Sequence, residues 1–191
     1  MEKLNDAAEK HIMTGDFKNH YIEARSHSYF SGKKPIVGLN IPGFKGYRYP
    51  EDPRLIDGFL YQDNYTDDER MPGNFAGFEV NFDTFTRSRI TLYDYRGRLM
   101  QEALKLGESA VYSILTRFLS DNATEVRFGK KVRFVIEDKG GTWVYEGNGK
   151  VNLSGWDDKE TISRNGVLLY ELNGEGFLLQ KDIAQRLRFL K

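Results

Sequence analysis

Aromatic and acidic side chains that could line a ligand-binding cleft recur along this chain of 191 residues. Tyr61, Asp63 and Tyr65 alternate, so a β-strand would carry all three on one face. Small-molecule pockets are mostly apolar, with a few polar groups that orient the ligand. The candidate ligand-binding residues that together have this composition are Tyr61, Asp63, Tyr65, Phe78, Glu79, Tyr95, Trp143, Tyr145, Trp156 and Asp157. The alternative interpretation is an aromatic core with the acids facing water.

The acids of this set could also carry acid–base chemistry. Glu79 and Asp157, acting as general acid and base, would make the protein a hydrolase, and glycoside hydrolysis uses a carboxylate pair of this kind. Acids at strand positions more often face solvent. Nucleophilic catalysis has little support, because the chain has no cysteine and no Gly-x-Ser-x-Gly motif. The sequence therefore assigns no catalytic residue and favours a non-enzymatic protein.

Metal and phosphate sites are weakly supported. The histidines are His11, His20 and His27, and the last two stand seven residues apart with Glu23 between them. Two histidines that bind one metal from the same helix usually have i, i+4 spacing, which this pair lacks. His20 and His27 are therefore expected to be ordinary surface residues, and no metal or cofactor is assigned. The segment GNGK at 147–150 lacks the spacing of a phosphate-binding loop and is interpreted as a hairpin turn.

Composition argues against two classes of partner. The 28 basic and 28 acidic residues cancel, so no overall charge attracts the protein to nucleic acid. No apolar run approaches the roughly 20 residues of a membrane-spanning helix, and the first fifteen residues lack the apolar core of a signal peptide. The absence of cysteine fits a reducing compartment. A soluble, cytoplasmic protein without a membrane partner is expected.

Two pairs of short segments are near-copies of each other. NFAGFE (74–79) matches NLSGWD (152–157), and LYDYRG (92–97) matches LYELNG (169–174). The offset is 78 residues in the first pair and 77 in the second, as a one-residue insertion between them would produce. The repeat predicts a duplicated unit, with Glu79 and Asp157 at equivalent positions on the wall of a cleft. The alternative is a purely structural repeat whose glycines allow a bulge or a close backbone approach.

Local sequence patterns predict the strands, helices and turns of each repeat unit. Aromatic and β-branched residues predict strands near 58–65, 75–85 and 88–95. Apolar residues at a period near 3.6 predict helix over 99–119, with a break at Gly107. Glycine-containing turns are predicted at 138–141, 147–150 and 164–167, and a short helix is predicted at the C-terminus.

The predicted architecture is an α+β fold in a single domain, residues 1–191. Two related antiparallel-strand-plus-helix units, an internal duplication, occupy about 58–120 and 133–191. A helix at about 14–31 precedes them, and a Pro/Gly-rich loop at about 33–57 connects it to the first unit.

The order of motifs along roughly 17–178 resembles a known family. The segments are YIEARSHSYFSGKKP, PGFKGYRY, GFLYQDNY, FAGFEV, LYDYRG, GTWVYEGNGKVNLSGWDDKE and LLYELNG. They are similar to a bacterial domain-of-unknown-function family whose members often lie C-terminal to a Cro/repressor-type helix-turn-helix. Phe78 stands where that family usually has an acid, whereas Asp157 and Asp158 keep the acid pair. The residues before Phe17 are too few for a helix-turn-helix, so the resemblance implies a stand-alone domain without established chemistry.

The function favoured by the sequence is a binding or sensor module with a cleft between the two units. The partner would be a small molecule or a protein, and exposed aromatic residues would also suit a homodimer interface. Two alternatives stay open: a small interaction or inhibitor protein, such as a mobile element encodes, and a hydrolase that uses Glu79 and Asp157.

Overall fold

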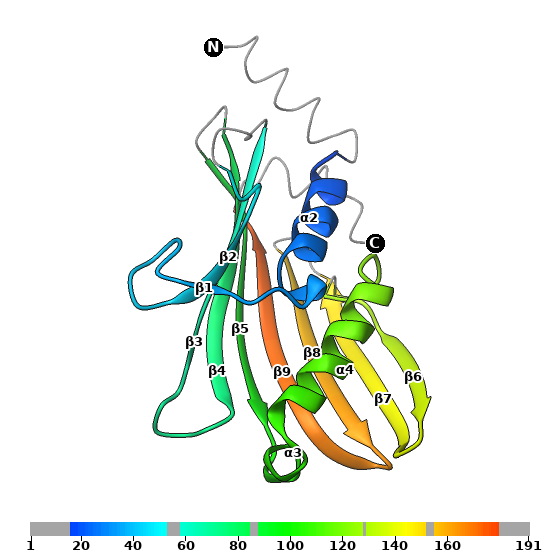
Figure 1. Ribbon diagram of the computed structural model, residues 1–191. Helices are drawn as coiled ribbons and strands as arrows, with labels where there is room; N and C mark the ends of the chain where they lie inside the picture. The colour runs from blue at the N-terminus through cyan, green and yellow to red at the C-terminus, as the bar shows by residue number, and fades with distance from the viewer. Residues whose placement is uncertain (1–15, 53–57, 85–87, 128, 152–154, 180–191) are drawn as a thin grey trace, which may run out of the picture.

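One curved antiparallel sheet makes up most of the protein (Figure 1). The structure, a computed structural model, describes residues 16–52, 58–84, 88–127, 129–151 and 155–179. Nine strands lie in the order β1-β2-β3-β4-β5-β9-β8-β7-β6. Their bounds are β1 (Ile36–Val37), β2 (Lys45–Tyr49), β3 (Phe59–Asp67), β4 (Asn74–Asp83), β5 (Ser88–Leu99), β6 (Val132–Asp138), β7 (Gly141–Val151), β8 (Gly155–Arg164) and β9 (Val167–Leu178).

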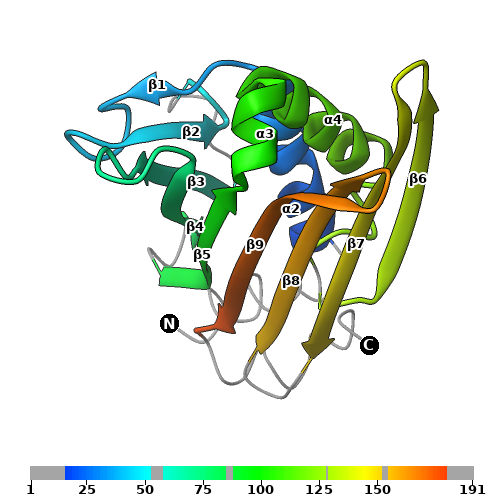
Figure 2. The same cartoon turned by 90° about the horizontal axis from the view of Figure 1, so that it is seen from below.

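The helices lie within the curve of the sheet, as the view from below shows (Figure 2). They are α2 (Asp16–His27), the 3-10 turn η1 (Tyr29–Ser31), α3 (Gln101–Leu106) and α4 (Glu108–Asp121). In α4, Val111, Leu115 and Phe118 are buried at helical spacing, so this face of the helix packs on the concave side. The predicted break at Gly107 is confirmed, because Gly107 has φ +101° between α3 and α4. No helix in the described ranges is long and apolar enough to cross a membrane.

The predicted α+β fold of two strand-plus-helix units is wrong. The strands of both halves join one continuous sheet, because β5 pairs antiparallel with β9 along Thr91–Leu99. Two separate units would each leave a twelve-residue strand with an unpaired edge, and pairing the two strands satisfies those backbone groups. The C-terminal helix predicted for the second unit lies outside the described residues.

The strand register also shows that the two sequence matches differ in kind. In the match offset by 77 residues, Tyr93 and Tyr170 are both buried on the concave face. In the match offset by 78, Glu79 is buried whereas Asp157 is exposed on the opposite face. Side chains of a strand alternate between its faces, so a slip of one residue inverts every orientation. Glu79 and Asp157 are therefore not equivalent positions of one cleft.

Two segments differ from their predicted local structure. The stretch 33–57, expected to be an irregular loop, contains β1 and β2, and β2 pairs with β3. The segment 147–150, expected to be a turn, continues β7 and pairs with β8. The predicted turns at 138–141 and 164–167 are confirmed; Asn165 and Gly166 both have positive φ, as a two-residue hairpin requires.

Glycines on the concave face leave room for large rings. A Cβ atom built on Gly176 would lie 2.1 Å from the Trp156 ring, which is buried. Trp156 in turn stacks on Tyr93, with ring centroids 6.1 Å apart and 11° between the planes. The ring therefore lies flat over the backbone of β9, where any side chain would displace it.

We expect Gly176→Ala to lower the free energy of unfolding by about 1–3 kcal/mol, because the added methyl group overpacks the Trp156 ring. The matched control on β9 is Asn173→Ala, which changes an exposed residue and should stay within about 0.5 kcal/mol of the native protein. Urea denaturation followed by tryptophan fluorescence measures both. Equal stability of the two variants would contradict the close approach of the ring.

Candidate functional site

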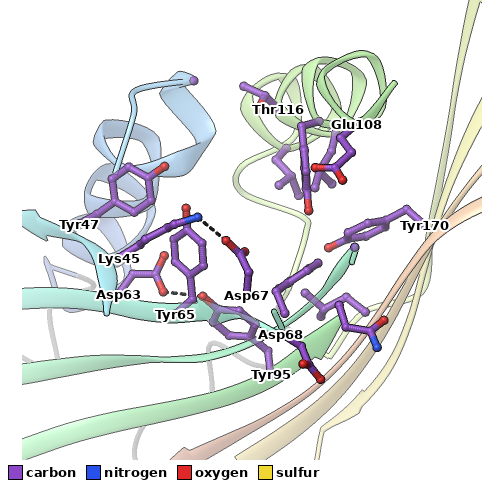
Figure 3. Close-up of a pocket in the computed structure, with 18 of the residues that line it drawn as sticks. Lys45, Tyr47, Asp63, Tyr65, Asp67, Asp68, Tyr95, Glu108, Thr116 and Tyr170 are labelled. Atoms are coloured by element: carbon purple, nitrogen blue, oxygen red, sulfur yellow. Dashed lines mark hydrogen bonds and ion pairs between the residues drawn. The ribbon is translucent and has the colours of Figure 1, made fainter. Parts of the chain in front are cut away.

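A cavity of about 570 Å³ opens between the concave face of the sheet and α4 (Figure 3). Its walls come from β2, β3, β4, β5 and β9, with α4 opposite them. The lining residues that carry the argument below are Lys45, Tyr47, Asp63, Tyr65, Asp67, Asp68, Glu69, Phe75, Tyr95, Glu108, Tyr112, Leu115, Thr116, Arg127, Tyr170 and Leu172.

Six aromatic side chains line the cavity. The rings of Tyr47 and Tyr65 stack with centroids 6.5 Å apart, and those of Phe75 and Tyr170 stack at 6.1 Å. The remaining two rings are those of Tyr95 on β5 and Tyr112 on α4. The cavity thus presents flat apolar faces from both the sheet and the helix.

A buried carboxyl group lies among these rings. Asp63 is 2% exposed, and the Tyr95 hydroxyl donates a hydrogen bond of 2.7 Å to its Oδ1. Burial, and to a lesser extent nearby Glu79, raise the pKa of Asp63 to about 8, although the Tyr95 hydrogen bond, Arg127 and Arg25 act in the opposite direction. At neutral pH this carboxyl group therefore holds its proton.

A buried ion network adjoins the cavity, and Arg127 belongs to both. Arg25 of α2 pairs with Glu79 of β4, with Nε 3.0 Å from Oε2. Arg127, which follows α4, donates to both carboxylate oxygens of Glu160, at 2.5 and 3.0 Å. Its Nη1 also lies 3.9 Å from Oε1 of Glu79. The network therefore connects α2 and the turn after α4 to two strands from opposite halves of the sheet.

Other polar groups complete the network. The Tyr21 hydroxyl donates to Oε2 of Glu79 at 2.7 Å, and Arg25 Nη1 donates to the backbone oxygen of Arg127 at 3.3 Å. Arg127 itself has φ +58°, a backbone conformation that is costly for a residue other than glycine. The backbone N–H of Gly129 donates to Asp158 at 2.9 Å, while burial and nearby Glu160 raise the pKa of Asp158 to about 7.

The structure brings three of the sequence-predicted site residues to the cavity: Asp63, Tyr65 and Tyr95. Glu79 belongs to the ion network and is fully buried. The remaining candidates lie elsewhere: Tyr61, Trp143, Tyr145 and Trp156 in the buried core, Phe78 half-buried on the opposite face and Asp157 exposed. Asp157 accepts a hydrogen bond from the Lys150 backbone N–H.

Glu79 and Asp157 cannot act together on one substrate, because they face opposite sides of the sheet and Glu79 has no solvent contact. The geometry therefore gives no support to a hydrolase built on this pair. His20 packs against the rings of Tyr49 and Phe59, and burial lowers its pKa to about 4. Among the described residues no group of three or more histidines and acids could hold a metal ion.

Sequence reasoning missed several residues of the cavity. Tyr47 and Tyr49 alternate as Tyr61, Asp63 and Tyr65 do, and this pattern could have identified β2 within the Pro/Gly-rich stretch. Tyr112 and Leu115 lie on α4, where apolar residues at helical spacing indicate packing against a core and not a ligand site. Arg127 carries no local signal, because its partners lie on distant strands.

Replacing Glu79 by Gln should lower the free energy of unfolding by about 3–5 kcal/mol, since it leaves the buried charges of Arg25 and Arg127 without this partner. The matched control, Asp157→Asn, changes the other acid of the sequence repeat and should stay within about 0.5 kcal/mol. Thermal and urea denaturation measure both variants. A Glu79→Gln protein as stable as the control would rule out the network as a structural constraint.

The buried carboxyl of Asp63 should make stability depend on pH. Its folded pKa is about 8, above an unfolded value of about 3.9, so the folded state holds an extra proton between these values. The contribution of Asp63 to stability is fully present below about pH 4 and is lost as pH rises through 8. The variant Asp63→Asn should thus gain stability relative to the native protein from pH 5 to pH 9, by at most about 1.4 kcal/mol per pH unit.

Urea denaturation of both proteins at each pH isolates this effect. Groups with the opposite sign, such as His20 with its lowered pKa, change both proteins alike and cancel in the difference. A stability difference that does not vary with pH would show that Asp63 titrates normally.

Comparison with known proteins identifies no relative: no family model, curated protein or solved structure matches this chain. The resemblance to a domain-of-unknown-function family therefore stays a prediction, and the argument for function depends on the cavity alone.

Proposed function

We propose that this protein is a non-catalytic binding or sensor module that takes a small, mostly apolar molecule into the cavity beneath α4. One observation carries the proposal: six aromatic side chains surround a space of about 570 Å³ that contains a single buried carboxyl group, that of Asp63. Ligand sites of about 300–1,000 Å³ with apolar walls and few polar groups are typical of small-molecule binding.

The polar group gives the cavity a means of orienting its ligand. Asp63 is held in place by Tyr95, and Tyr95 lies on the central strand β5, so the carboxyl position is fixed by the sheet. Apolar walls provide affinity through burial of the ligand, while one placed polar group selects among ligands of similar shape. This division of roles suits binding.

The cavity differs in location from the cleft between two units that the sequence suggested. Most of its sheet residues come from β2, β3, β4 and β5, and only Tyr170 and Leu172 belong to the second half. Helix α4 provides the opposite wall through Glu108, Tyr112, Leu115, Thr116 and Leu119. The ligand would therefore lie between a helix and one side of the sheet.

Filling the cavity should weaken ligand binding. Thr116 lines it from α4, so Thr116→Trp should lower the affinity for Nile red, a neutral apolar dye, by about tenfold or more. The matched control is Arg117→Trp, which introduces the same indole at the next, exposed position of the helix. Fluorescence titration of the dye measures the native protein and both variants.

Equal loss in both variants, or no loss in either, would show that the dye does not bind in this cavity. The surface to test next for a protein partner would then be the outer edge of β6, where Val135 is 47% exposed.

A further inference from the structure

We propose that the ligand of this cavity is an organic cation, an ammonium or pyridinium group carried on an apolar body. This inference rests on the proposed binding function and adds the charge of the ligand to it. Three features of the cavity support it: the orientation of its rings toward a common space, the pairing of its acids and bases, and the environment of Asp63 (Figure 3).

Aromatic rings provide the first argument. The face of an aromatic ring attracts a cation within about 6 Å of its centroid, and several rings around one space form a cage for quaternary ammonium groups. Tyr47 on β2, Tyr65 on β3 and Tyr95 on β5 line the same cavity wall as Asp63. Lys45 of the protein itself makes such a cation–π contact with this wall, since its Nζ lies 6.0 Å from the centroid of the Tyr65 ring.

Asp63 provides the second argument. Among the described residues, the Asp63 side chain accepts one hydrogen bond, from the Tyr95 hydroxyl, and takes part in no ion pair. In the close-up, one carboxyl oxygen points to Tyr95 and the other points away from it (Figure 3). A cation beside that second oxygen would stabilise the ionised form of this acid, which burial otherwise disfavours.

The charged residues that line the cavity differ in whether they are paired. Lys33, Lys45 and Arg127, the basic residues of the lining, are each paired with an acid, namely Glu51, Asp67 and Glu160. By contrast, the lining acids Asp68, Glu69 and Glu108 have no ion pair among the described residues. The mouth therefore carries excess negative charge, which favours the entry of cations.

An anionic ligand would face a specific obstacle. Arg127 is the only guanidinium that lines the described cavity, and both carboxylate oxygens of Glu160 already accept hydrogen bonds from it. Binding an anion there would require the displacement of a buried carboxylate, which is costly. The arginine therefore contributes structure rather than a binding charge.

Proton release should accompany cation binding. The groups that face Asp63 are Glu79 on β4, Tyr95 on β5, Tyr47 on β2, Arg25 on α2 and Arg127 after α4. Together with burial they give Asp63 a pKa of about 8, so a cation that pairs with the carboxylate displaces its proton at lower pH. The affinity for a permanently charged cation should rise from pH 6.5 to 8.5, by at most about tenfold per pH unit.

A matched pair of fluorescent probes tests the inference. The cation is 4-[4-(dimethylamino)styryl]-N-methylpyridinium, and its neutral analogue is 4-[4-(dimethylamino)styryl]pyridine, which differs by one methyl group and the charge. At pH 8.5 we expect the cation to bind about tenfold or more tightly than the analogue. Asp63→Asn should remove most of this preference but leave binding of the neutral analogue within about threefold.

The matched control is Asp157→Asn, an acid on the opposite face, which should keep the full preference for the cation. A second variant, Tyr65→Leu, should reduce the preference for the cation several-fold while leaving Asp63 unchanged. It tests the inference if Asp63→Asn does not fold. Nile red binding, sensitive to Thr116→Trp, reports whether the cavity binds ligands at all.

The outcomes separate the two proposals. Equal affinity for both probes, with Nile red still bound in the cavity, would overturn the cation inference and leave the binding function standing. A preference that survives both Asp63→Asn and Tyr65→Leu would also overturn it, because the cation would then bind elsewhere. Loss of Nile red binding along with both probes would overturn the binding function itself.

Discussion

The buried ion network on the concave face is the constraint on which the rest of the structure depends. Arg25, Glu79, Arg127 and Glu160 are all at most 6% exposed, yet each is charged. Removing such groups from water costs several kcal/mol per ion, and only close pairing with satisfied hydrogen bonds offsets that cost. Because the partners come from α2, β4, the segment after α4 and β8, few other arrangements of these elements would satisfy them.

The cavity follows from that arrangement. Arg127 follows α4 by only a few residues, so its pairing with Glu160 fixes where the helix ends above the sheet. The helix then packs its apolar residues on one part of the concave face and leaves a space beside them. Rings of Tyr47, Tyr65 and Phe75 reach into this space but do not fill it. A site for a ligand is thus a consequence of how the helix is anchored.

Sequence patterns predicted local structure well, but they did not predict which distant strands pair. The alternation of Tyr61, Asp63 and Tyr65 predicted a strand with one aromatic face, and Gly107 predicted the break between α3 and α4; both are confirmed. The pairing of β5 with β9 joins residues about 70 to 90 positions apart and leaves no local signal. The fold class was therefore wrong although most of the strands were right.

The candidate site was only partly predictable for a related reason. The sequence match suggests that Glu79 and Asp157 are equivalent. Side chains alternate between the two faces of a strand, however, so an offset of 78 instead of 77 puts them on opposite faces of the sheet.

Arg127 was undetectable, because its role depends on Glu79 and Glu160, both distant in sequence. That same pairing affects the charge of the cavity: because the guanidinium is neutralised by its partners, the acids at the mouth set the local charge. The network that anchors the helices therefore also leaves a site whose unmet charge is negative.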